Sequence, residues 1–170
     1  MKNWWERKRT NEITAYPWLH DDVVQRLAQI VKRRMTVVEH GCGGSTLWFA
    51  ERVKKVFTVE SDYEWAKEIE RRAPNNVSVI RKSGEIPPGL PECDLLFVDG
   101  EHPTRGLYIA AAHHMVKPGG WVVFDNANRP EYARQRANLL ELCGDRETFD
   151  RNTNFSQFFV TDFYRMPESV

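Results

Sequence analysis

The chain has 170 residues, and its 24 lysine and arginine residues are balanced by 24 aspartate and glutamate residues. This length predicts one domain, residues 1–170, that is large enough to bury a core. Because the net charge is zero, the composition gives no electrostatic reason to expect a nucleic acid or a membrane surface as partner. Three widely spaced cysteines, with no apolar run of signal-peptide or membrane-spanning length, predict a soluble protein of the reducing cytoplasm.

The N-terminal part of the sequence combines an aromatic segment with an amphipathic stretch. Residues 1–20 hold Trp4, Trp5 and Trp18 among charged residues. We interpret this segment either as an arm or lid, or as a terminal segment that its aromatic side chains anchor. A helix is predicted over residues 20–34, because polar capping residues precede apolar residues at helical spacing.

The most informative stretch is residues 35–60. It reads in this order: apolar residues 36–38, Glu39, a glycine turn at 41–45, a helical stretch at 46–53, apolar residues 56–59 and Glu60. A strand, a glycine turn, a helix and a second strand that ends in an acid are typical of a nucleotide-binding βαβ unit. The glycines let the backbone approach a ligand, and the acid that ends the second strand can hold ribose hydroxyls.

The rest of the chain continues the alternation of strands and helices. A helix is predicted from a capping box at residues 61–64 to residue 73, followed by a strand at 77–80, a proline-rich loop at 82–91 and a strand at 94–99. A helix at 104–116, a turn at 117–120, a strand at 121–124 and a helix at 130–143 come next. Residues 146–165 hold two β-rich pieces on either side of 152–154, and the stronger of them is 157–164. This order predicts an α/β fold with a doubly wound, mostly parallel, Rossmann-like sheet and an antiparallel C-terminal strand pair.

Polar side chains follow the predicted strands at the points where the strands end. These residues are Glu39, Glu60, Ser83, Asp99 and Asp125. The carboxyl ends of parallel strands form one edge of a doubly wound sheet, and ligands bind at that edge. We therefore expect these five side chains to surround one binding site.

Four segments in this order resemble the motifs of the class I S-adenosylmethionine-dependent methyltransferases. They are VVEHGCGGST, FTVES, CDLLFVDGEH and VKPGGWVVFDN. A nicotinamide-dependent Rossmann dehydrogenase is the nearest alternative, but Thr46 stands where its fingerprint has a third glycine.

The resemblance implies a set of cofactor contacts. Gly41 and Gly43 would approach the methionine part of S-adenosylmethionine, and Glu60 would bind the ribose hydroxyls. Ser45 would bind the methionine carboxylate or, equally well, serve as a plain helix cap. The remaining implied contacts are Glu39, Ser61, Asp99, and Ser83 or Gly84 beside the adenine.

The pattern is closest to small-molecule O-methyltransferases of the catechol and macrolide-sugar types. In the catechol-type enzymes three residues at matching positions hold magnesium, and here these are Asp99, Asp125 and Asn126. Two carboxylates and an amide oxygen suit this hard cation. His102 stands where those enzymes have a basic lysine, and it is the candidate general base, beside Asp99 as the second catalytic candidate.

Other roles for these residues stay open. Asp99 touches cofactor or substrate in metal-free members of the fold, and Asp125 with Asn126 can form an Asx turn. His102 can instead cap the following helix, and Glu101 is an alternative acid. The adjacent His113 and His114 face different directions on a helix, which disfavours a metal role for them.

The resemblance implies a transferase that methylates a hydroxyl of a small molecule or sugar, with magnesium as an option. The alternatives are a cofactor-binding protein with no or different activity, and a metal-independent methyltransferase for another acceptor. Because the chain has little material for a substrate cap, we expect either an acceptor on an open face or a second subunit, in a homo-oligomer, that closes the site. A membrane partner is not expected. Nucleic acid is disfavoured as a partner, and because no Asn-Pro-Pro-Tyr-like motif follows the strand at 94–99, base N-methylation of DNA is disfavoured.

Overall fold

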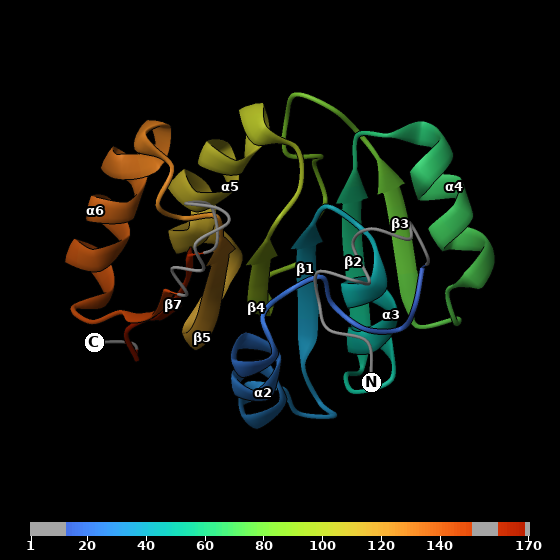
Figure 1. Cartoon of the computed structure of the whole chain (residues 1–170), viewed down its shortest axis with the longest axis horizontal. Coiled ribbons are helices and arrows are strands. Elements are labelled where there is room, and N and C mark those ends of the chain that lie inside the picture. The colour runs from blue at the N-terminus through green and yellow to red at the C-terminus, as the bar shows by residue number, and fades with distance from the viewer. Residues whose placement is uncertain (1–12, 151–159, 169–170) are drawn as a thin grey trace.

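A computed structural model describes residues 13–150 and 160–168 of the chain, and all structural statements refer to these residues. Figure 1 shows their arrangement. In chain order the elements are α2 (Asp21–Ile30), β1 (Thr36–His40), α3 (Gly44–Ala50), β2 (Lys55–Glu60), α4 (Tyr63–Arg72), β3 (Val77–Arg81), β4 (Cys93–Val98), α5 (His102–Met115), β5 (Val116–Asp125), the 3-10 turn η1 (Pro130–Tyr132), α6 (Ala133–Cys143), β6 (Glu147–Asp150) and β7 (Val160–Arg165).

The described strands form one seven-stranded sheet in the order β3-β2-β1-β4-β5-β7-β6. β1 to β5 run parallel, and β7 pairs antiparallel with both β5 and β6. This confirms the predicted doubly wound sheet with its antiparallel C-terminal pair. The strand order reverses direction between β1 and β4, so the loops after these two strands diverge and leave room for a ligand.

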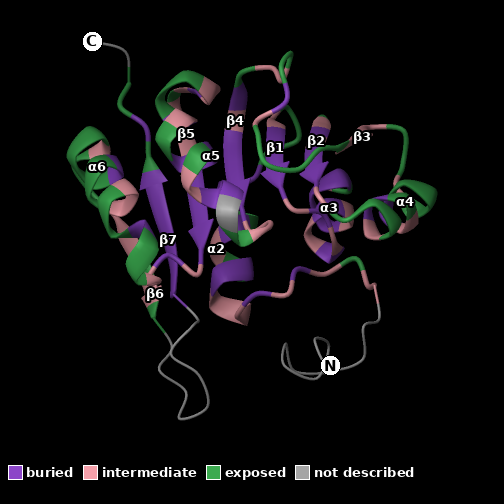
Figure 2. Cartoon of the chain, turned by 90° about the horizontal axis from the view of Figure 1, so that it is seen from above, coloured by how far each residue is buried: buried purple, intermediate pink, exposed green. Residues whose placement is uncertain are grey.

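The core lies on both faces of the sheet. On one face, Leu27 of α2 and Phe49 of α3 pack against buried strand residues such as Phe97. On the other face, Tyr108 of α5 and Leu139 of α6 pack against the opposite side of the same strands. Figure 2 shows the central strands as mostly buried between helices whose outer surfaces are exposed. Cover on both faces explains the unbroken apolar runs of the parallel strands.

Two helix boundaries differ from the sequence prediction. α2 ends at Ile30 rather than near residue 34, because Val31 has an extended backbone with ψ of 132°. α4 is capped by Asp62 rather than Ser61, since the Asp62 carboxylate accepts a hydrogen bond of 2.9 Å from the Trp65 amide. Ser61 is instead bound to the neighbouring Glu60 carboxylate.

The starts of β5 and α5 also differ from the sequence prediction. β5 begins at Val116, so the predicted turn at residues 117–120 lies inside the strand, where the Gly120 carbonyl accepts a hydrogen bond from the Met166 amide. α5 begins at His102, two residues earlier than predicted, and its cap is Glu101. Of the two C-terminal β-rich pieces, β6 and β7 are described. Residues 151–159, with the predicted break at 152–154, lie outside the described residues.

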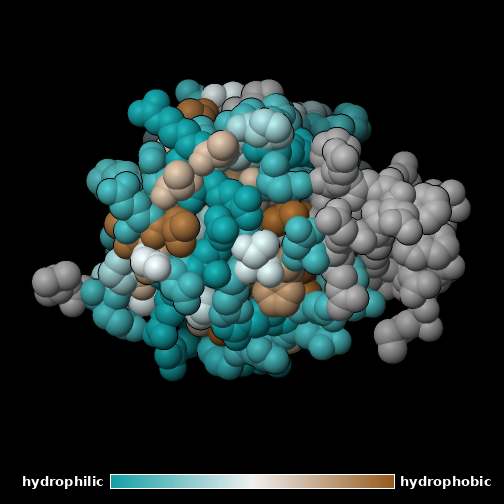
Figure 3. Space-filling model, turned by 60° about the vertical axis from the view of Figure 1, so that its left-hand side comes forward, coloured by the Kyte–Doolittle hydropathy of each residue, from teal (hydrophilic) through white to brown (hydrophobic). Residues whose placement is uncertain are grey.

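Within the described ranges, no helix is long and apolar enough to span a bilayer. The face shown in Figure 3 is mainly hydrophilic, with apolar side chains in small separate patches. The exposed large hydrophobic residues are Tyr63, Leu107, Leu140 and Leu142.

Two glycines bring the loop after β1 against the loop after β4. Gly41 has a φ of +93°, and a Cβ placed there would lie 2.5 Å from the Cα of Gly100. A Cβ on Gly100 would in turn lie 2.8 Å from the Gly41 nitrogen. The two backbones therefore touch where any side chain would force them apart, and this contact fixes the distance between the two loops.

We predict that Gly41→Ala lowers the free energy of unfolding by about 3 kcal/mol, because it combines backbone strain with overpacking against Gly100. Urea denaturation measures this loss. Gly89→Ala is the matched control, since Gly89 has a φ of +85° but nothing within 4 Å of the added Cβ. It should cost only the strain, about 1 kcal/mol. Equal losses in the two variants would show that the Gly41–Gly100 contact is not a constraint.

Candidate functional site

A pocket of about 400 Å³ lies at the carboxyl ends of β1, β2, β4 and β5. This volume is in the range of sites for cofactors and small molecules. The pocket is lined by Trp18, Gly41, Cys42, Gly43, Gly44, Ser45, Glu60, Ser61, Trp65, Asp99, Gly100, Glu101, Arg105, Asp125, Asn126 and Arg129. Most of the residues that the sequence analysis assigned to the cofactor and metal therefore meet at one place.

The glycine turn after β1 presents its backbone to this pocket. The Cys42 amide donates to Glu60 Oε2 over 2.9 Å, and the Cys42 carbonyl accepts from Trp65 Nε1 over 2.7 Å. At Gly43, which lines the pocket, a Cβ would meet nothing within 4 Å. The turn is thus held by Glu60 and Trp65, while its backbone at Gly43 is open to the pocket, so a ligand can lie directly against it.

Glu60 has a fixed orientation at the end of β2. Its Oε1 accepts hydrogen bonds from the Ser61 and Asp62 amides at 2.8 and 2.9 Å, while its Oε2 accepts from Cys42. A carboxylate oxygen can accept more than one hydrogen bond. Ser61 Oγ also donates to Oε1, over 3.3 Å, so the lone pair left for a ligand hydroxyl in the pocket that Glu60 lines is on Oε2.

Glu39, in contrast, lies beneath the turn and is fully buried. Its two carboxylate oxygens accept hydrogen bonds of 2.5 Å from Ser45 Oγ and Thr46 Oγ1. Burial raises the pKa of Glu39 to about 7, although these hydroxyl groups act in the opposite direction. Glu39 is absent from the pocket lining, so among the described contacts it holds the start of α3. Ser45 is not the cap of α3, since Gly43 occupies that position.

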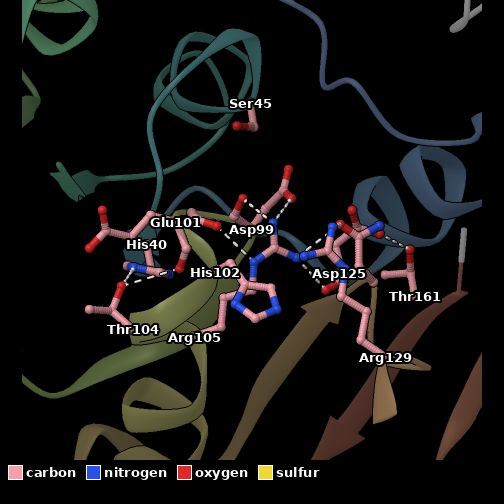
Figure 4. A network of polar contacts seen from close by, with 12 residues as sticks. His40, Ser45, Asp99, Glu101, His102, Thr104, Arg105, Asp125, Arg129 and Thr161 are labelled. Carbon is pink, nitrogen blue, oxygen red and sulfur yellow. Dashed lines mark hydrogen bonds and ion pairs between the residues drawn. The ribbon is translucent and has the colours of Figure 1, made fainter. Parts of the chain in front are cut away.

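Arg105 lines the pocket, and Figure 4 shows its guanidinium between Asp99 and Asp125. It donates from Nε to the Gly100 carbonyl over 2.7 Å, and from Nη2 to the carbonyl and Oδ1 of Asp99 over 2.8 and 3.1 Å. Its Nη1 donates to the Asp125 carbonyl over 2.8 Å and to Asn126 Oδ1 over 3.0 Å. Arg105 therefore joins the loop after β4 to the loop after β5.

The three predicted metal ligands make side-chain hydrogen bonds within the chain. Asp99 and Asn126 direct side-chain oxygens to Arg105, and Asp125 Oδ1 accepts a hydrogen bond of 2.7 Å from Thr161 Oγ1. Magnesium requires several oxygen ligands in octahedral geometry. As these residues are arranged, they do not fit that ion. Elsewhere in residues 13–150 and 160–168, no group of three or more histidine, cysteine, aspartate or glutamate side chains could hold a metal.

Besides Glu39, two further predicted site residues, His102 and Ser83, lie outside the pocket lining. His102 has its Nε2 bound to the Glu131 carboxylate, and its side chain is 51% exposed. Ser83 Oγ donates over 3.0 Å to Glu101 Oε1, and the Gly84 amide donates to the same oxygen over 3.3 Å. Glu101 does line the pocket, so Ser83 and Gly84 contact a pocket residue.

His40 packs beside the glycine turn, as the sequence position suggested. Its Nε2 lies 2.7 Å from Thr104 Oγ1, and its ring stacks on Tyr108 with 4.3 Å between the centroids. Burial lowers the pKa of His40 to about 4, so the ring is neutral near pH 7. His40 therefore belongs to the packing that supports Gly100 rather than to the acid–base chemistry.

The sequence analysis missed Cys42, Trp65 and Arg105. Trp65 and Cys42 act through a backbone contact that no local pattern reveals. One feature of the sequence could have indicated a special role for Arg105. It is a cation in the first turn of α5, where the helix dipole disfavours positive charge.

A family model described as a methyltransferase domain matches residues 38–127, which is more than half of the chain. The chain belongs to the methyltransferase-domain family. Its sheet has the architecture of the class I S-adenosylmethionine-dependent methyltransferases, and the match spans the glycine turn, Glu60, Asp99 and Asp125. A comparison with curated proteins finds no match.

The solved structures with a similar fold include proteins named for different activities. Precorrin 8W decarboxylase from Methanobacterium thermoautotrophicum is 20% identical, with 88% of this chain and 91% of that chain covered and a TM-score of 0.63. The tRNA (m1A58) methyltransferase TrmI from Aquifex aeolicus is 19% identical, with 88% and 69% covered and a TM-score of 0.62. The O-methyltransferase TomG from Streptomyces achromogenes is 19% identical, with 85% and 78% covered and a TM-score of 0.63. This methyltransferase-domain protein therefore shares a fold with enzymes of different substrates, and the fold alone does not name its acceptor.

The buried Glu39 predicts a pH dependence of stability. Above its ordinary pKa of 4.5 the unfolded chain loses this proton, whereas the folded chain keeps it until about pH 7. Folding stability contributed by this group is therefore complete below pH 4.5 and is lost as the pH rises to 7, by about 3 kcal/mol in total. Glu39→Gln cannot ionise and lacks this loss.

Urea denaturation of both proteins at pH 5 and pH 8 measures the effect. We expect the free energy of unfolding of the wild type, relative to that of Glu39→Gln, to be lower at pH 8 than at pH 5. Glu51→Gln, at an exposed carboxylate on the end of α3, controls for the change in net charge. A difference between wild type and Glu39→Gln that does not change with pH would contradict the assigned ionisation.

Proposed function

We propose that this protein transfers the methyl group of S-adenosylmethionine to a hydroxyl oxygen of a small molecule or sugar. The observation that carries the proposal is the open backbone of Gly43 beside the fixed carboxylate of Glu60, in a pocket of about 400 Å³. A bare backbone and an oriented acid suit an amino-acid tail and a ribose at adjacent positions. Membership of the methyltransferase-domain family supports the same ligand.

The pocket residues divide into two groups in this proposal. Gly41, Gly43 and Ser45 hold the methionine part of the cofactor, and Glu60 accepts hydrogen bonds from the ribose hydroxyls. Toward the adenine lie Ser61 and Glu101, and Glu101 is held in turn by Ser83 and Gly84. Glu39 supports the glycine turn from below through its hydrogen bonds to α3.

When bound, the cofactor supplies an electrophilic methyl group on a sulfonium. The acceptor oxygen forms a bond to the methyl carbon, the carbon–sulfur bond breaks, and its electron pair stays on the sulfur of S-adenosylhomocysteine. The acceptor loses its hydroxyl proton to a base or to water. The contribution of the chain is mainly to align the two reactants and exclude solvent. Asp99 lines the pocket and is the carboxylate that we propose beside the reacting groups, whereas His102 lies outside the lining.

The N-terminal segment forms part of the wall of this site. A Cβ on Gly44 would lie 2.5 Å from the Thr14 carbonyl and 2.2 Å from the Tyr16 carbonyl, so residues 14–16 cross the start of α3. Trp18 follows in the lining, with its ring centroid 5.9 Å from that of Trp65. This contact supports the lid interpretation for residues 13–18. The other tryptophans of the segment, Trp4 and Trp5, lie outside the described residues.

Two features favour a small acceptor. The pocket of about 400 Å³ has the size of a small-molecule site. The zero net charge of the chain gives no general attraction for nucleic acid. No step of the proposal involves magnesium, because Arg105 already binds two of the three residues that would hold it.

We predict that S-adenosylmethionine binds the purified protein and that Glu60→Gln weakens the binding about tenfold or more, because a charged hydrogen-bond acceptor for the ribose is lost. Isothermal titration calorimetry measures both dissociation constants. Glu51→Gln serves as the control with the same chemical change outside the pocket. If the wild type binds neither S-adenosylmethionine nor S-adenosylhomocysteine, the proposed function is wrong.

The acceptor is tested by measuring release of S-adenosylhomocysteine over panels of sugars, phenols and nucleosides. We expect turnover with a sugar or a phenol, reduced on the order of a hundredfold in Asp99→Asn, because Asp99 lies at the acceptor side of the pocket. Turnover with nucleosides alone would contradict the acceptor class. Binding of cofactor without turnover of any acceptor would favour a cofactor-binding protein without this activity.

A further inference from the structure

Arg105 lies at the place where the sequence analysis expected a divalent cation. Its guanidinium contacts Asp99 and Asn126, which are two of the three predicted metal ligands, and Figure 4 shows it between the ends of β4 and β5. We infer that Arg105 is the resident cation of this site. Its guanidinium takes the position of a divalent metal, orders the loops after β4 and β5, and keeps metal ions out of the pocket.

Every N–H group of the Arg105 guanidinium is used in a hydrogen bond within the chain. A guanidinium carries five N–H groups, one on Nε and two on each Nη. Nε makes one bond, to Gly100, and each Nη makes two, to Asp99 and to the Asp125–Asn126 pair. All five acceptors belong to the chain itself. A set of contacts this complete belongs to a built-in component of the site, since no donor is left over for a ligand.

A metal ion beside Arg105 would be unfavourable, since both carry positive charge. Its side chain is 7% exposed, so water screens its charge poorly. A metal ion placed on Asp99 or Asn126 would lie beside this buried positive charge. Asp125, the third predicted ligand, has its Oδ1 bound to the Thr161 hydroxyl. The oxygen atoms of this site therefore already face positive charge, from Arg105 and, at Asn126 Oδ1, also from Arg129.

The position of Arg105 in the sequence supports the same assignment. It lies in the first turn of α5, which is an unfavourable place for a cation because of the helix dipole. A side chain on a helix leans toward the N-terminus, so Arg105 reaches back to the ends of the strands. The contact with the Asp99 carboxylate and four further oxygens offsets the unfavourable dipole.

Arg105 also acts on the cofactor side of the pocket through Gly100. Its Nε holds the Gly100 carbonyl, and Gly100 is the residue whose backbone touches Gly41 of the glycine turn. Arg105 is thus a positioning residue for both halves of the site. The inference deepens the proposed function, since it makes the proposed methyl transfer independent of metal. It is tested on metal occupancy without cofactor or acceptor, so its failure is distinguishable from a failure of methyl transfer.

The experiment is a titration of the full chain with Mn²⁺, followed by the electron paramagnetic resonance signal of the free ion. Wild type should leave the signal of free Mn²⁺ unchanged. Arg105→Ala removes the guanidinium from Asp99 and Asn126, so it should bind one Mn²⁺ at least about tenfold more tightly than wild type. Adding Asp99→Asn to this variant should abolish the gain. A residue that merely stabilised the loops would not produce a new metal site when removed.

Arg129→Ala is the matched control. Arg129 also donates to Asn126 Oδ1, over 3.2 Å, but Arg105 stays in place when it is removed, so no metal site should appear. Equal gains in both variants would overturn the inference. Mn²⁺ binding by wild type that is lost in Asp99→Asn would also overturn it, as would a folded Arg105→Ala that binds no Mn²⁺. If Arg105→Ala does not fold, Arg105→Gln, which has no charge and keeps an amide, is measured in its place with the same expected gain.

Discussion

The buried guanidinium of Arg105 is the interaction on which the site most depends. β4 and β5 are paired up to Val98 and Phe124, but beyond these residues hydrogen bonds between the two strands no longer set the distance between the loops that follow them. Arg105 fixes it through hydrogen bonds to Asp99, Gly100, Asp125 and Asn126. A charged group that is almost completely buried is costly unless its hydrogen bonds are satisfied, and here they are. Its satisfaction therefore requires both loops to keep this arrangement.

The same constraint extends to the cofactor half of the pocket. Arg105 holds Gly100, Gly100 touches Gly41, and the turn that begins at Gly41 is held by Glu60 through the Cys42 amide. On its other side, the turn is held by the buried Glu39 carboxylate, which accepts hydrogen bonds from Ser45 and Thr46 at the start of α3. The pocket is thus preorganised by a continuous series of contacts from β5 to β2, made by the Arg105 and Glu60 side chains and by the backbones of Gly100 and Gly41. Such preorganisation suits a reaction in which the protein mainly aligns two reactants.

Local patterns in the sequence were sufficient for the fold, and most of the predicted cofactor residues line one pocket. Their contacts with a cofactor stay a prediction. The alternation of strands and helices gave the sheet, and the glycine turn with Glu60 indicated the cofactor region, because each depends on neighbouring residues. Arg105 could not be found in this way. A lone arginine in a helix has no period, and its five acceptors lie on two loops that only the folded sheet brings together. The early end of α2 was equally invisible, since the polar residues after Ile30 suit both helix and turn.

The most direct measurement is a crystal structure of the protein with S-adenosylhomocysteine, grown in the presence of Mn²⁺ and examined for anomalous scattering. We expect the ligand to lie between Gly43 and Glu60, with its ribose at Glu60 and its sulfur toward Asp99. Arg105 should keep its contacts, and no manganese peak should appear beside Asp99. A ligand bound outside this pocket, or a manganese ion in the place of the Arg105 guanidinium, would contradict this description of the site.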